Sequence, residues 1–141
     1  MRFFVAWTFF VIVLFSANAF AAQAVTMVSN MNFGDQVVGI GVSAVVNPND
    51  AGAAVFDATG LTPGKAVTCT VTTAPINIVI AGGGATRTIA VNNFIISGCT
   101  SVVPASGSIS GIRVGATATV KNTNLSGQYT ASNANFRLNI K

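Results

Sequence analysis

Residues 66–99, AVTCTVTTAPINIVIAGGGATRTIAVNNFIISGC, decide the fold of this chain. Val67, Cys69 and Val71 alternate with threonines, which is the period-2 pattern of a strand with one buried face. The alternation returns in residues 76–80, stops at three consecutive glycines, and resumes in residues 88–91 and 94–97. The segment therefore predicts several short strands, with the glycines forming a flexible hairpin turn.

The start of the chain has the features of a signal peptide. Arg2 supplies a positive charge, residues 3–15 are apolar, and small residues at 17, 19 and 21 fit cleavage after Ala19 or Ala21. A retained membrane anchor is the alternative, but the apolar run is shorter than the roughly 20 residues that span a bilayer. We expect a signal peptide at 1–21, a single domain at 22–141 with no membrane span, and export to the periplasm, cell surface or medium.

Charged side chains are scarce. They make up 7% of the chain, against about 25% in an average globular protein. After residue 21 all the acids precede all the bases. The net positive charge of this part is small, and its basic residues are too scattered for a nucleic-acid groove. We expect no nucleic-acid partner. Low charge with abundant Thr, Asn, Ser, Gly and Val is typical of an extracellular β protein, and it leaves few charges to protect strand edges.

The two cysteines, Cys69 and Cys99, favour a disulfide because the chain is expected to be exported. Two free buried thiols are the alternative. Cys69 shares the parity of Val67 and Val71, so the bridge should lie on the core side and tie this strand to the end of the strand at 94–97. Closing a loop of about 30 residues should contribute roughly 3–4 kcal/mol.

Alternation predicts further strands on both sides of the cysteine-bracketed segment. The clearest is residues 112–120, in which Ile112, Val114, Ala116, Ala118 and Val120 share one face. No stretch of ten residues after the signal peptide shows helical periodicity. About eight or nine short strands separated by turns predict an all-β domain, an immunoglobulin-like or pilin-like β-sandwich.

The first and last strands of the domain carry apolar residues on alternate positions. The first is either an ordinary strand of the domain or a donor strand that completes a neighbouring subunit. The candidate strand-addition contacts are Val25, Met27, Met31 and Phe33 in the first strand, and Phe136, Leu138 and Ile140 in the last.

Residues for catalysis are missing. The chain has no His, which excludes Ser-His-Asp and Cys-His arrangements. Asp35, Asp50 and Asp57 fall in turns or at strand ends, and Asp50 with its neighbouring asparagines lacks the spacing of a calcium loop. The glycine run lacks the Lys-Ser/Thr of a phosphate loop. We predict no catalytic, cofactor-binding or metal-binding residue, and a protein that is not an enzyme.

Several short motifs occur in a fixed order: Phe33-Gly34, Gly60 before Pro63-Gly64, Val114-Gly115-Ala116-Thr117, and Gly127-Gln128-Tyr129-Thr130 before the last strand. With them the chain resembles a bacterial domain-of-unknown-function family of exported, pilin-like β-sandwich proteins. The resemblance implies an immunoglobulin-like sandwich and suggests a surface or fimbria-like role, without an established activity.

Two functions follow as expectations. The first is a structural or adhesive subunit of a bacterial surface assembly, which joins copies of itself or other fibre subunits by β-strand addition. The alternative is a monomeric periplasmic or secreted binding module for a carbohydrate or protein partner, although sugar recognition has little support because no Trp follows the signal peptide. Tyr129 is either a core aromatic or an exposed contact residue.

Overall fold

The computed structural model describes residues 22–36, 39–71, 76–82, 84–127, 129–131 and 138–140. These residues form strands and one short 3-10 turn, and they contain no α-helix. The elements are β1 (Ala24–Ser29), β2 (Ser43–Val46), β3 (Ala54–Thr59), β4 (Cys69–Val71), β5 (Ile76–Val79), η1 (Ala85–Arg87), β6 (Thr88–Ser97), β7 (Ile109–Thr119), β8 (Thr130–Ala131) and β9 (Leu138–Ile140). The all-β prediction is confirmed, and no helix in these ranges is long and apolar enough to cross a membrane.

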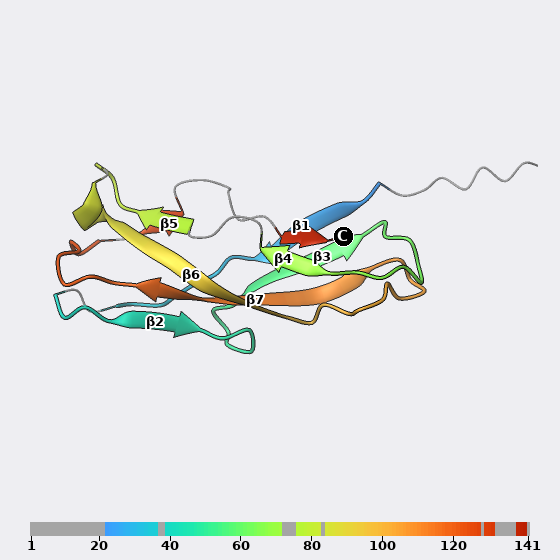
Figure 1. Cartoon of the computed structure of the whole chain (residues 1–141). Helices are drawn as coiled ribbons and strands as arrows, with labels where there is room; N and C mark the ends of the chain where they lie inside the picture. Colours follow the sequence, from blue (N-terminus) through green and yellow to red (C-terminus); the bar gives the residue numbers. More distant parts are fainter. Residues whose placement is uncertain are drawn as a thin grey trace, which may run out of the picture.

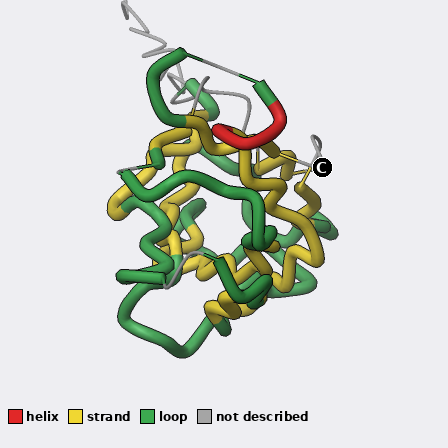
Figure 2. Tube along the Cα trace, turned by 90° about the vertical axis from the view of Figure 1, so that its left-hand side faces the viewer, coloured by secondary structure: helices red, strands yellow, loops and turns green. Residues whose placement is uncertain are grey.

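Most strands belong to one curled antiparallel sheet with the order β1-β3-β7-β6-β5-β8. β2 also pairs with β7, and β4 pairs with β9 in a separate two-stranded sheet. Figure 1 shows β2 and β7 on one side of an elongated molecule and β1, β4 and β5 on the other, with β6 crossing between them. In Figure 2 the strands surround the centre of the molecule, so the sheet is not one flat layer.

β7 is the centre of the sheet. Its inward-facing residues and Val120 just beyond it are buried, and the side chains of Ile112 and Val114 are 0% exposed. The buried positions 112, 114, 116, 118 and 120 are those that the alternation predicts. β6 pairs with one edge of β7, and β2 and β3 pair in turn with the other edge.

Buried side chains form two clusters along the length of the sheet. The first core consists of Ala54, Phe56, Ala58, Val67, Val103, Ile109, Ile112 and Val114. The second core consists of Ala44, Ile89, Val91, Ala116, Ala118 and Val120. Cys69, Val71 and Ile140 pack against the first core, so the β4–β9 sheet covers this half of the molecule. Met31 and Phe94 contact both cores.

A β-bulge in β6 keeps the core face in phase. The register with β7 shifts between Asn92 and Ile95, and Asn93 has a φ of 52°. Asn tolerates this left-handed conformation better than most residues. As a result Phe94 and Ile96 pack on the cores while Ile95 between them is 52% exposed. Without the bulge, strict alternation from Val91 would turn Phe94 outward.

β2 and β3 follow one another along the same edge of β7 and are separated by a loop at residues 47–53. The loop crosses directly over Gly115, where a Cβ atom would lie 2.8 Å from Pro48 N and 2.8 Å from the Asn47 carbonyl carbon. Arg113 fixes the loop, because its guanidinium donates hydrogen bonds to the Pro48 and Asp50 carbonyl oxygens. The Asp50 carboxylate accepts a hydrogen bond from Asn47 N at 2.7 Å.

The disulfide between Cys69 and Cys99 is present, with a Cα–Cα distance of 6.1 Å. It links β4 to the residues just beyond the end of β6, and Cys69 packs against the first core. Both the bridge and its position on the core side are as predicted.

Candidate functional site

β1 is an exposed strand at one edge of the main sheet. All six of its residues are exposed, and Val25, Met27 and Val28 are 42%, 46% and 60% exposed. β1 pairs only with β3, from Ala24 opposite Thr59 to Ser29 opposite Val55, and none of its residues belongs to either core. Its outer edge has no partner within the described part of the chain. β1 is therefore an edge strand held mainly by backbone hydrogen bonds.

The structure separates the four apolar residues predicted for the donor face of the first strand. Val25 and Met27 lie in β1 and are exposed. Met31 and Phe33 lie beyond β1 and are half-buried: Met31 packs against both cores and Phe33 against the second core. Val25 and Met27 are thus available for contacts with another molecule, whereas Met31 and Phe33 stabilise their own domain.

Backbone contacts turn the chain inward after β1. Asn32 N donates a hydrogen bond to the Gly52 carbonyl oxygen at 2.8 Å, and a Cβ atom at Gly52 would collide with the Asn32 carbonyl oxygen. The Asn32 side chain then accepts a hydrogen bond from Gly34 N at 2.8 Å, and Gly34 has a φ of 66°. This Asx turn directs residues 31–36 across the inner face of the sheet.

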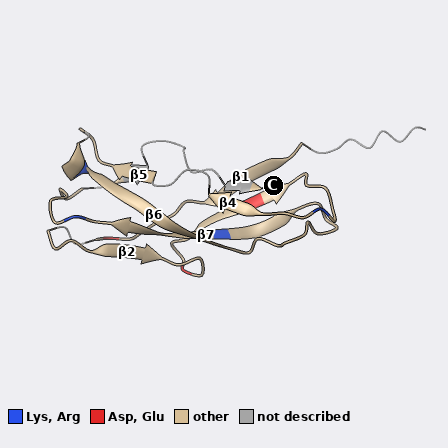
Figure 3. Ribbon diagram, in the orientation of Figure 1, with Lys and Arg blue, Asp and Glu red and all other residues tan. Residues whose placement is uncertain are grey.

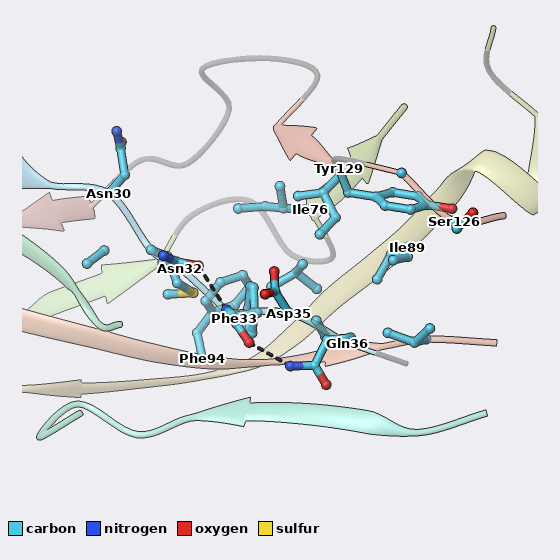
Figure 4. A pocket seen from close by; sticks show the side chains of 18 of the residues that line it. Asn30, Asn32, Phe33, Asp35, Gln36, Ile76, Ile89, Phe94, Ser126 and Tyr129 are labelled. Atoms are coloured by element: carbon cyan, nitrogen blue, oxygen red, sulfur yellow. Dashed lines mark hydrogen bonds between the residues drawn. The ribbon is translucent and has the colours of Figure 1, made fainter. Parts of the chain in front are cut away.

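A groove of about 920 Å³ lies between residues 30–36 and the second core. Its apolar walls come mainly from β5, β6, the end of β7 and the residues after β1, with Met27 of β1 and Ala54 of β3 at the edge, and Figure 4 shows side chains converging on the groove. The apolar lining residues include Met31, Phe33, Ile76, Ile78, Ile89, Val91, Phe94, Ala118 and Val120. Unlike the first core, which the β4–β9 sheet covers, this half of the molecule is hollowed.

Part of the polar lining of the groove is engaged within the chain. The Asn32 oxygen accepts from Gly34 N, and the Gln36 amide donates to the Phe33 carbonyl oxygen at 2.6 Å. The side chains of Asn30, Asp35 and Ser126 have no hydrogen-bond or ion-pair partner among the described residues, and of these Asp35 alone carries a carboxylate. Figure 4 shows this carboxylate turned into the groove, below Ile76 and beside Phe33. Among the residues that the structure describes, no Lys or Arg lines the groove.

Tyr129 closes one side of the groove and has a structural role. Its ring packs against the second core, and its hydroxyl donates to the carbonyl oxygens of Leu125 and Thr86, at 2.8 and 3.2 Å. The neighbouring Asn124 is 5% exposed; its amide donates to the Thr86 and Thr88 carbonyl oxygens and its oxygen accepts from Lys121 N. The core interpretation of Tyr129 is therefore the one that the contacts support.

The candidate contacts of the last strand lie elsewhere. Leu138 and Ile140 are in β9, opposite Val71 and Cys69 of β4, and Ile140 packs against the first core. Phe136 lies outside the described residues. β1 is at an edge of the large sheet and β9 pairs with β4 in the small sheet, so no hydrogen-bond ladder joins the two predicted contact strands.

The few charges are dispersed over the molecule (Figure 3), and no group of three His, Cys, Asp or Glu residues within the described ranges could hold a metal ion. Asp57 accepts a hydrogen bond from Gly111 N at 2.8 Å, where β3 and β7 shift register. Asp50 is used within its turn. Asp35 is therefore the one acid of the chain without a structural partner in the described part. The sequence offered a weak signal for it, as the single charge in the apolar segment after the signal peptide.

Comparisons with known proteins give no relative: no family model and no curated protein match the sequence, and no solved structure matches the fold. The resemblance to exported pilin-like proteins stays a prediction, and function has to be argued from the geometry.

Proposed function

We propose that the protein is an exported subunit of a bacterial surface fibre, and that its copies associate by β-strand addition with β1 as the donated strand. The observation that carries the proposal is the state of β1. It pairs through one edge only, all its residues are exposed, and it contributes to neither core. A domain that loses β1 keeps both cores and exposes the free edge of β3.

The energetics favour exchange of β1 between copies. Leaving its own β3 costs backbone hydrogen bonds and little apolar burial, and the same bonds form again when β1 pairs with the β3 of another copy. Intramolecular and intermolecular pairing are then close in energy, and protein concentration decides between them.

The edges involved lack the features that usually prevent such pairing. β1 reads AVTMVS and contains no charged residue and no proline. β3 reads AVFDAT, and its one charge, Asp57, is engaged with Gly111 N. Lys and Pro on edge strands are the common protection against intermolecular pairing, and their absence supports an edge that receives a strand. The pilin-like sandwich suggested by the resemblance belongs to the same proposal, with the β4–β9 sheet facing the first core.

A removable crosslink tests the proposal. Ala24 and Thr59 are opposed in the β1–β3 ladder and both are exposed, so Ala24→Cys with Thr59→Cys should form a disulfide within the monomer. We expect the oxidised protein to stay monomeric at concentrations at which the reduced protein forms fibres, as measured by size-exclusion chromatography and electron microscopy. Wild type in the same mild reductant controls for the native bridge, and each single variant controls for the substitutions.

The same variant reveals the pairing in a polymer. Protein assembled while reduced and then oxidised should give a ladder of covalent multimers on a non-reducing gel, because β1 of one copy lies beside β3 of the next. Polymers whose new disulfides are all within single copies would show that β1 does not exchange.

A binding module is the second candidate, and the groove is the observation that favours it. A mature domain, residues 22–141, that stays monomeric at all concentrations in size-exclusion chromatography would support this candidate over the first. The mainly apolar lining of the groove fits an apolar ligand better than a carbohydrate.

A further inference from the structure

We propose that the groove binds a small organic cation with an apolar body, an alkyl amine in its simplest form, and that the Asp35 carboxylate is its counter-ion. The inference goes beyond assembly by strand addition and does not depend on it. It rests on three observations: the size of the groove, its apolar walls of aliphatic and aromatic side chains, and a carboxylate without a partner among the described residues that points into it.

The groove has the dimensions and lining of a ligand site. Its volume of about 920 Å³ is within the range of roughly 300–1,000 Å³ that is usual for small-molecule sites, which are mainly apolar with a few polar groups. The walls are firmly held, because Ile89 and Val91 at its floor are 5% and 3% exposed and pair with β5 through the main sheet. An alkyl chain placed against them would remove apolar surface from water at little cost in protein order.

Asp35 gives the groove its charge selectivity. The fold uses the other two acids of the chain, Asp50 in a turn and Asp57 at a bulge, but it provides no partner for Asp35 among the described residues. The Asp35 side chain is exposed at the groove, and a cationic ligand bound there would form a charge-assisted hydrogen bond with its carboxylate. The same carboxylate repels a fatty acid, and a neutral alcohol gains less from it.

The test compares three ligands with the same chain length: n-octylamine, n-octanol and n-octanoate. The protein is the Ala24→Cys/Thr59→Cys variant in its oxidised form, which holds β1 in the monomer so that assembly does not affect the result. Affinities are measured by isothermal titration calorimetry, and the site is located by chemical-shift changes of isoleucine methyl groups. We expect octylamine to bind at least about tenfold more tightly than octanoate, with the largest shifts at Ile76, Ile78 and Ile89.

Two charge variants decide the role of Asp35. Asp35→Asn should lower the affinity for octylamine about tenfold, which is the magnitude of a hydrogen bond to a charged group, and should remove most of the preference over octanoate. Asp57→Asn changes the net charge equally, lies outside the groove and keeps an acceptor for Gly111 N, so it should leave the affinity unchanged.

Several results would overturn the proposal. These are equal binding of the amine and the carboxylate, no binding of any of the three ligands, an equal loss in the two Asp variants, or methyl shifts confined to residues outside the groove. None of these results bears on strand addition, because β1 is crosslinked throughout. Fibres formed by the reduced variant with no amine binding would therefore support the proposed function and reject this site.

Discussion

At the scale of single residues, two glycines allow the chain to pass over itself. Gly115 lies beneath the loop between β2 and β3, and Gly52 touches the residues after β1. At both positions the atoms that a Cβ would meet belong to the backbone, which cannot move aside as a flexible side chain could. These contacts, rather than backbone conformation, explain why glycine is needed at the two positions.

Gly115→Ala should destabilise the domain by about 3 kcal/mol or more, because the new methyl group is forced against the Pro48 and Asn47 backbone. Gly64→Ala is the matched control: its φ of 76° is unfavourable for alanine but nothing lies within 4 Å, so it should cost only about 1–2 kcal/mol. Urea unfolding followed by circular dichroism measures both. Equal losses would mean that the loop does not rest on Gly115.

Asn124 is the buried polar residue that joins three segments. Replacing it with alanine removes hydrogen bonds to the Thr86 and Thr88 carbonyl oxygens and from Lys121 N. We expect Asn124→Ala to lower the free energy of unfolding by about 2–3 kcal/mol, since a buried side chain loses three hydrogen bonds. Asn122 is an exposed neighbour, and Asn122→Ala should lower the free energy of unfolding by less than about 0.5 kcal/mol. A similar loss at both positions in thermal or urea unfolding would contradict the assigned network.

At the scale of elements, the end of β1 marks a change from exposed side chains to side chains that pack against the cores. Met27 is 46% exposed, whereas Met31 packs against both cores. Met27→Asp should therefore leave the melting temperature of the monomer nearly unchanged and abolish fibres, because a charge is placed on the donated strand.

Met31→Asp should instead lower the free energy of unfolding by several kcal/mol, because a carboxylate is forced against apolar side chains; it therefore cannot serve as a test of assembly. Melting curves and electron microscopy of both variants separate the two effects. Fibres formed by a well-folded Met27→Asp protein would rule out β1 as the donor.

The disulfide stabilises the β4–β9 sheet, which covers the first core. β4 has only three residues and makes a single ladder with β9, so the bridge from Cys69 to Cys99 is its main link to β6. Replacing both cysteines with serine should cost roughly 3–4 kcal/mol while the β-rich circular dichroism spectrum is kept. A variant as stable as wild type would show that β4 is held by packing alone.

At the scale of the whole molecule, strand positions were predictable from the sequence and their arrangement was not. The alternation in residues 112–120 and the parity of Cys69 correctly located the buried face of β7 and the core side of the bridge. These patterns arise because alternate residues of a strand face the core, so the order of apolar and polar residues in the sequence is enough to predict them.

The candidate site depended on contacts between residues distant in sequence. The inward turn after β1 requires Asn32 to meet Gly52, and nothing in the pattern of Met31 and Phe33 distinguishes a donor face from a core face. In the sequence, Asp35 looks like an ordinary turn residue. Its position at the groove could not be predicted, because the groove is formed with β5 and β6, which begin about 40 residues or more later in the chain.

The central position of β7 also determines when the domain can fold. β2, β3 and β6 all pair with a strand that ends at Thr119, so a chain that emerges amino terminus first has no closed sheet until most of it has appeared. The contacts of β7 with β2 and β3 span more than 50 residues, which delays their formation further. Among the ladders of the described residues, only β1–β3 and the β5–β6 hairpin can form before β7 is available, so charge-poor strands stay exposed to one another during that interval.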